Sequence, residues 1–178
     1  MAPYRLSLTT ASEVAQLLQT TWQLYPPSHL ATPNVALRPG AAHRIGAYLL
    51  SFGYLQPTQL VTALTHQQKI DATHESLFVG DILIQHRLIQ PAVLVSILMV
   101  QMVDRLLDPN RTTPLRMGEY LVATGALSPS LLARALLTQT DLRQQNKSIP
   151  LGEILIQQGI LPPQVVNTTV TNWTFANW

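Results

Sequence analysis

Apolar residues recur along this chain in a pattern that repeats four times, each time around a glycine. An apolar residue stands directly before the glycine, a leucine three residues after it, and a proline eleven residues after it. Counted from the glycine, further apolar residues occupy positions +9, +14 and +18. The glycines, which are separated by 34, 38 and 34 residues, are Gly46, Gly80, Gly118 and Gly152. A period of this length is typical of a tandem repeat array.

Each repeat is predicted to form a short helix, a tight turn and a longer helix. In repeat 3 the first helix is expected at about Gly118 to Thr124. Gly125 then ends it, because glycine readily adopts the left-handed conformation that follows many helices. Ser128 is expected to cap the second helix, with Pro129 at its first position, where the absent N–H costs nothing. The glycines that end the first helix of repeats 1 and 4 are Gly53 and Gly159.

Helices this short are marginal alone in water, so the repeats must pack on one another. The equal spacing within two pairs, with a longer gap between them, predicts pairwise packing. We therefore expect a mainly α fold, in which four helix-turn-helix repeats form two tandem modules behind an extra N-terminal helix. The connections 69–78 and 141–150 leave room for small strands.

The predicted organisation has four parts. Residues 1–40 hold an amphipathic helix, from about Ser12 to Leu24, and a proline-rich linker. Residues 41–108 form the first module, residues 109–174 the second, and residues 175–178 an aromatic tail. The large aromatic residues near the C-terminus either fold back on the last module or anchor a partner.

Composition favours burial over charge. Among the 178 residues, 47% are apolar and only 11% are charged, which indicates a compact core or a lasting protein interface. The formal charge is +2. The chain has no run of basic residues, so we expect no binding to DNA or RNA. The most apolar run, 92–103, is too short to cross a bilayer, and the N-terminus lacks the apolar core of a signal peptide. We therefore expect no transmembrane segment and a cytoplasmic location.

Catalytic and metal-binding patterns are missing from the sequence. The absence of cysteine excludes disulfides and thiolate metal sites. No phosphate-binding loop of the Gly-x-x-x-x-Gly-Lys-Ser/Thr type is present, and no serine lies in a nucleophile motif. The spacing of the histidines fits no common metal motif, and they are His29, His43, His66, His74 and His86. We expect no catalytic residues, no metal and no cofactor, and hence not an enzyme.

The array resembles the N-terminal domain of type II secretion and type IV pilus assembly ATPases, the MshEN-type module. That motif runs Arg-Leu-Gly, an aliphatic residue, a second Gly, and then Leu, Leu and Gln at set distances. Repeats 1 and 3 match it, and repeats 2 and 4 depart from it at Phe78, Arg87, Pro150 and Trp173. The resemblance covers residues 44–173. It implies a stand-alone module, since no ATPase domain follows the repeats in this sequence.

Some members of that family bind cyclic di-GMP, and the resemblance carries this expectation to two sets of residues. An arginine fork can bond the O6 and N7 atoms of guanine, leucines can cover the bases, and a glycine lets the backbone approach phosphate. The implied ligand residues are Arg44, Gly46, Leu60, Leu64 and Gln67 in repeat 1, and Arg116, Gly118, Leu132, Leu136 and Gln139 in repeat 3.

Two functions follow as hypotheses. The first is a non-catalytic adaptor or linker subunit that docks on a larger assembly, such as pilus or secretion machinery or a light-harvesting antenna. Its predicted partner contacts lie near the two ends of the chain, at Leu17, Trp22, Trp173, Phe175 and Trp178. The alternative is a stand-alone cyclic di-GMP receptor that uses the Arg-x-Gly motifs.

Overall fold

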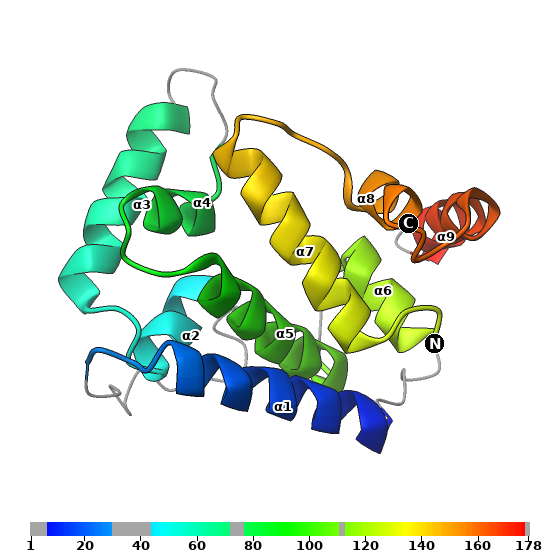
Figure 1. The fold of residues 1–178 in the computed structure, drawn as a ribbon, viewed down its shortest axis with the longest axis horizontal. Helices are drawn as coiled ribbons and strands as arrows, with labels where there is room; N and C mark the ends of the chain where they lie inside the picture. Colours follow the sequence, from blue (N-terminus) through cyan, green and yellow to red (C-terminus); the bar gives the residue numbers. More distant parts are fainter. Residues whose placement is uncertain (1–6, 30–43, 72–76, 111–112, 177–178) are drawn as a thin grey trace. The chain divides into compact units, whose positions relative to one another are not determined.

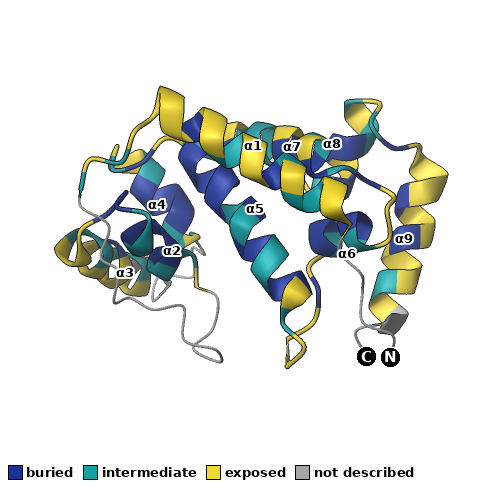
Figure 2. Ribbon diagram, turned by 90° about the horizontal axis from the view of Figure 1, so that it is seen from below, coloured by how far each residue is buried: buried dark blue, intermediate teal, exposed yellow. Residues whose placement is uncertain are grey.

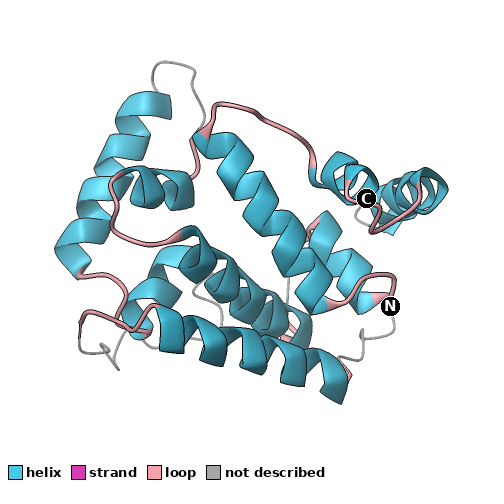
Figure 3. Ribbon diagram, in the orientation of Figure 1, coloured by secondary structure: helices cyan, strands magenta, loops and turns pink. Residues whose placement is uncertain are grey.

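The structure is a computed structural model, and it describes residues 7–29, 44–71, 77–110 and 113–176. Every regular element in this part of the chain is a helix, as Figure 3 shows, which confirms the predicted mainly α fold. No strand occurs in residues 141–150 or in the described part of 69–78. In chain order the helices are α1 (Leu8–Leu24), α2 (Ile45–Ser51), α3 (Pro57–Asp71), α4 (Val79–Gln85), α5 (Pro91–Leu107), α6 (Met117–Ala123), α7 (Pro129–Gln144), α8 (Leu151–Gln157) and α9 (Pro163–Ala176) (Figure 1).

The sequence repeat and the helices are in register. Each of the four short helices, α2, α4, α6 and α8, has seven residues and begins directly before its repeat glycine. Each of the long helices that follow, α3, α5, α7 and α9, begins at the proline of position +11. Proline suits this place because its fixed backbone angle matches a helix and its missing N–H has no partner there. In repeat 3 the Ser128 hydroxyl accepts a hydrogen bond from the Leu131 N–H, as a helix cap does.

The turn between the two helices is the same in all four repeats. The residue at position +7 has a positive φ, and its N–H donates to the carbonyl at position +4. The next N–H donates to the carbonyl of the leucine at position +3, which completes a Schellman turn. Gly125 occupies this position with φ 74°, whereas Arg87 holds the same left-handed conformation with φ 57°. Repeat 2 therefore keeps the turn although it lacks the glycine.

The repeat glycine lets the short helix contact the long helix of its own repeat closely. A Cβ atom on Gly118 would lie 2.9 Å from Leu132 Cδ1, and one on Gly46 would lie 2.8 Å from Leu60 Cδ1. Both partners stand at position +14, and Leu94 and Val166 fill that position against Gly80 and Gly152. Figure 2 shows the buried residues of the short helices α2, α4 and α6, where the leucine of position +3 has no exposed surface. The apolar residues at positions +3 and +14 thus form the core of each repeat.

Helix α1 starts earlier than the sequence pattern predicted. It begins at Leu8 rather than near Ser12, because the Ser7 hydroxyl accepts the Thr10 N–H at 3.1 Å and caps the helix one turn upstream. Its end at Leu24, just before two prolines, agrees with the prediction.

Contacts divide the chain into two compact units. The N-terminal unit is Leu18–Gln101, and the C-terminal unit combines Met1–Leu17 with Met102–Trp178. In the N-terminal unit α3 packs on α4, and the hydroxyl groups of Thr21 and Ser96 are hydrogen-bonded. In the C-terminal unit α7 packs on α8, and α6 packs on α9. The predicted domain boundaries stay a prediction.

Candidate functional site

The residue two positions before each repeat glycine is the N-cap of a short helix. These four N-caps have extended backbones and exposed side chains, and they are Arg44, Phe78, Arg116 and Pro150. An exposed guanidinium at an N-cap can meet an anion or a flat base edge from solvent. Arg44 and Arg116, the two arginines implied by the resemblance, therefore stand in equivalent, accessible places.

The two candidate glutamines bond to the backbone of the following repeat. Gln67 Nε2 donates to the Leu77 carbonyl at 2.7 Å, and Gln139 Nε2 donates to the Ile149 carbonyl at 2.9 Å. Each carbonyl lies three residues before the glycine of the next repeat. A carbonyl in the approach to a helix needs such a donor when it is shielded from water. These glutamines thus fix where the next short helix begins.

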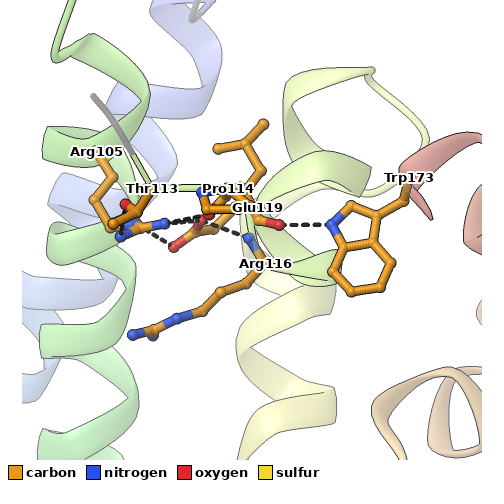
Figure 4. A network of polar contacts seen from close by, with 7 residues as sticks. Arg105, Thr113, Pro114, Arg116, Glu119 and Trp173 are labelled. Carbon is orange, nitrogen blue, oxygen red and sulfur yellow. Dashed lines mark hydrogen bonds and ion pairs between the residues drawn. The ribbon is translucent and has the colours of Figure 1, made fainter. Parts of the chain in front are cut away.

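Trp173 takes the place of this glutamine in repeat 4. It stands at position +21, as Gln139 does in repeat 3, and its indole Nε1–H donates to the Leu115 carbonyl. Figure 4 shows the indole nitrogen directed at this backbone segment, next to Arg116. Leu115 lies three residues before Gly118, so this bond runs from repeat 4 back to repeat 3. The departure from the sequence motif at Trp173 preserves the hydrogen bond that the motif residue makes.

In repeats 3 and 4, a side chain from each repeat packs against the glycine of the other. A Cβ atom on Gly152 would lie 3.2 Å from Met117 Cε, and one on Gly118 would lie 3.4 Å from Leu151 Cδ2. Met117 and Leu151 are the residues directly before the repeat glycines. In addition, the short helix of each repeat packs on the long helix of the other, α6 on α9 and α8 on α7. Repeats 3 and 4 therefore contact each other in the same way in both directions.

A buried ion pair lies at the start of α6. Arg105 Nε donates to Glu119 Oε1 at 2.8 Å, and both side chains are almost fully buried. The other guanidinium nitrogens of Arg105 donate to Thr113 Oγ1 at 3.0 Å and to the Pro114 carbonyl at 2.8 Å. Glu119 Oε2 also accepts the backbone N–H of Arg116 at 2.9 Å. Figure 4 shows that the Arg116 side chain extends away from this network.

This ion pair is a structural one. The bonds from Arg105 to Thr113, Pro114 and Glu119, and from Arg116 to Glu119, join the end of α5 to the loop before α6 and to its first turn. In the sequence Glu119 directly follows a repeat glycine, in the first turn of a predicted helix, and nothing there identifies it as part of an ion pair. Its partner Arg105, 14 residues earlier, could not be identified because no local pattern relates the two.

The remaining ligand candidates divide into packed and accessible residues. Leu132 is buried and Leu60 half-buried, and both fill the space next to a glycine. Leu136 is half-buried, and Leu64 is 41% exposed. The accessible candidates are thus Arg44, Arg116 and Leu64, while Gly46 and Gly118 are buried within helix contacts.

The predicted partner contacts are also of two kinds. Leu17 is half-buried, and the half-buried Trp173 is held by its hydrogen bond to Leu115. Trp22 is 42% exposed, although one side of its ring packs on Phe52 with the ring centroids 5.8 Å apart. The side chain of Phe175 and the whole of Trp178 lie outside the described residues.

Two groups in the N-terminal unit go beyond the expectations from the sequence, which gave Leu64 only as an implied ligand residue and Phe78 only as a departure from the motif. The first contains large apolar side chains at the surface: Val61 and Leu64 on α3, and Phe78 before α4. The second is a pair of histidines, His66 and His86, whose ring nitrogens lie 3.1 Å apart. Their separation of 20 residues fits no local metal or catalytic motif, so only the fold brings them together.

The described residues contain little that suggests a reaction. They include no group of three or more His, Asp or Glu side chains that could hold a metal ion. Burial raises the pKa of Tyr54 to about 12, so its hydroxyl stays protonated at neutral pH. None of the described helices has the length and apolar character needed to cross a membrane.

Comparison with protein-family models, with curated proteins and with solved structures finds no match to this chain.

Proposed function

We propose that this chain is a non-catalytic, cytoplasmic adaptor that binds another protein through the apolar surface of its N-terminal unit. The observation that carries the proposal is the exposure of three large side chains, Val61 at 62%, Leu64 at 41% and Phe78 at 64%. They are termed here the apolar set.

The fold links two of these residues, Leu64 and Phe78, through Gln67. Leu64 precedes Gln67 by three residues on α3, so the two share a helix face. Gln67 bonds to the carbonyl of Leu77, the residue directly before Phe78. Large apolar and aromatic side chains that stand in solvent are the groups from which protein interfaces draw most of their binding energy.

The N-cap position adds a second argument for an adaptor. In the motif that repeats 1 and 3 share, this position is an arginine, whereas repeat 2 presents the Phe78 ring. The scaffold residues of repeat 2, in contrast, keep their places: Gly80 contacts Leu94, and Arg87 keeps the left-handed turn. Both departures of repeat 2 from the motif, Phe78 and Arg87, are exposed and leave the scaffold intact, as a protein contact requires.

A photo-crosslinking experiment tests the adaptor proposal. A benzophenone amino acid at position 78 is expected to capture a specific protein in the native cell. The same group at Gln68, which is exposed on α3, provides the matched control. The captured protein is then purified and titrated with the wild type, Phe78→Lys and Gln68→Lys. Phe78→Lys should weaken binding at least about tenfold, and Gln68→Lys should not. Equal binding by both variants would reject the proposal.

A second candidate function is a cyclic di-GMP receptor, and the exposure of Arg44 and Arg116 favours it. Both arginines are exposed at the start of a short helix, where a guanine edge can approach from solvent. The other polar side chains of the implied set, Gln67 and Gln139, already donate to backbone carbonyls. Such a receptor would therefore rely on the arginines, with Leu64 and Leu136 beside the bases.

Calorimetric titration with cyclic di-GMP decides this second candidate. Binding at micromolar concentrations, lost in Arg44→Ala plus Arg116→Ala and kept in the exposed α7 control Arg134→Ala, would support a receptor. Absence of heat at tens of micromolar, or binding unchanged by the double substitution, would reject it.

A further inference from the structure

His66 and His86 face each other across the contact between α3 and α4. His66 Nδ1 and His86 Nε2 are 3.1 Å apart, and the two rings meet edge to face with an interplanar angle of 81°. His66 is half-buried and His86 exposed, so solvent and small ions reach the gap between the two nitrogens.

This separation matches the distance between two nitrogens bound to one metal ion. With metal–nitrogen bonds of about 2.05 Å, two ligands are about 2.9 Å apart at a right angle and about 3.3 Å apart at the tetrahedral angle. The observed 3.1 Å lies between these values. The two helices therefore already hold these nitrogens at a spacing that one metal ion can bridge.

The backbone holds both histidines in place. His66 lies within α3, one residue before Gln67, whose side chain is bonded to Leu77 at the start of α4. His86 is the C-cap of α4, and its N–H donates to the Ile82 carbonyl. The left-handed Arg87 fixes the chain directly after it. Ligands held by regular elements lose less freedom on binding than ligands on loops do.

We propose that His66 and His86 bind one divalent ion of the late first transition row, of which copper(II) is bound most tightly. Imidazole nitrogen is a preferred ligand of copper, nickel and zinc, and copper leads in affinity among them. Water, or a group from a bound protein, fills the other coordination positions. The proton shared between the rings moves through solvent to His66 Nε2 or His86 Nδ1, so neutral rings bind the ion without a change in protein charge.

The metal site is independent of the adaptor proposal, and it is tested on the full chain with copper(II) alone. Calorimetry should give one tight site per chain, and electron paramagnetic resonance should show two nitrogen ligands. His66→Gln and His86→Gln should each lower copper affinity at least about tenfold, since a metal site loses one of two protein ligands. Glutamine can preserve a hydrogen bond here, which limits any effect on folding. The matched control is His29→Gln, because His29 is hydrogen-bonded to Gln56 elsewhere in the same unit.

Thermal unfolding provides a second measurement. Copper should raise the unfolding temperature of the wild type and of His29→Gln, because an ion that binds only the folded state stabilises it. It should raise that of His66→Gln and His86→Gln much less. Affinity unchanged in these two variants, or lost only in His29→Gln, would overturn the proposal. So would a wild type that binds no copper at this site.

Discussion

Trp173 donates its indole N–H to the backbone carbonyl of Leu115, and so makes from repeat 4 to repeat 3 the bond that Gln139 makes from repeat 3 to repeat 4. Two chemically different side chains, one on α9 and one on α7, thus donate an N–H to the carbonyl at the same repeat position. What the repeat requires at position +21 is a donor, rather than a particular residue.

Substitution of Trp173 tests this equivalence. Trp173→Phe keeps an aromatic ring but removes the donor, and should lower the free energy of unfolding by about 1–3 kcal/mol because the buried Leu115 loses the hydrogen bond from the indole. Trp173→Gln loses ring area but restores an amide donor, and should retain more stability than Trp173→Phe. Urea unfolding followed by circular dichroism measures both. A glutamine variant less stable than the phenylalanine variant would mean that ring burial, rather than the hydrogen bond, holds α9.

Replacement of Arg87, which has a left-handed backbone, by glycine should stabilise the protein. A non-glycine residue in this conformation destabilises the folded state by about 1–2 kcal/mol. Glycine removes this strain, but part of the gain is offset because glycine also increases the conformational entropy of the unfolded chain. We expect Arg87→Gly to raise the free energy of unfolding by about 0.5–1 kcal/mol.

The reverse change gives the matched control for Arg87→Gly. Gly125→Ala, at the same turn position with φ 74°, should be destabilising although no atom lies within 4 Å of the added Cβ. Denaturant midpoints measure both variants. No gain in Arg87→Gly would indicate that the Arg87 side chain makes contacts worth as much as the backbone strain.

The glycine contacts predict a difference between repeats. Gly118→Ala should cost about 1–3 kcal/mol, because the new Cβ would press on Leu132, which is buried and cannot move aside. Gly46→Ala should cost less, because Leu60 is only half-buried and can turn toward solvent.

A double-mutant cycle checks the cause of the Gly118 effect. Leu132→Ala opens the space that the new methyl group needs, so Gly118→Ala should be less costly in that background, with a coupling of about 0.5–3 kcal/mol. Strictly additive free energies of unfolding would show that the methyl group and Leu132 do not meet.

The Arg105–Glu119 pair should tolerate joint replacement better than single replacement. Arg105→Met leaves the Glu119 carboxylate buried without its guanidinium, and should cost about 3–5 kcal/mol. Arg105→Met with Glu119→Leu removes both charges and should recover much of this loss. Chemical unfolding of the two variants measures the difference. A double variant as unstable as the single one would show that the bonds to Arg116 and Pro114 matter more than charge burial.

Tyr54 predicts a loss of stability in strong alkali. Its pKa is raised to about 12 by burial, against about 10 in an unfolded chain, so between these values the unfolded state loses its proton first. The free energy of unfolding should therefore fall as pH rises from about 10 to about 12. In Tyr54→Phe this contribution should be absent, and stability at pH 7 should be unchanged or higher, because the buried hydroxyl has no hydrogen-bond partner among the described residues. Equal pH profiles for the two proteins would contradict the assignment.

The local part of the fold could be read from the sequence. Position +7 predicted the turn, position +11 the start of the second helix, and position +14 a core residue, because each depends on neighbours within about one repeat. The predicted start of α1 was wrong, because Ser7 caps the helix and the periodicity of the apolar residues does not reveal that bond.

The contacts between distant residues could not be read in the same way. Arg105 with Glu119, and His66 with His86, meet only because helices pack, and no sequence spacing specifies that packing. The role of Trp173 was hidden for another reason. By residue type tryptophan and glutamine are unlike. The backbone carbonyl needs only an N–H donor, and both side chains carry one.

The bond from position +21 to the following or preceding repeat sets a minimum size for an autonomous piece of this chain. The glycine contact with position +14 closes within one repeat and survives any cut between repeats. The carbonyls of Leu115 and Ile149 each accept a hydrogen bond from the other repeat of their pair, so a fragment with half a pair would lose this bond. A fragment that contains both repeats 3 and 4 should therefore be the smallest that keeps both of these bonds.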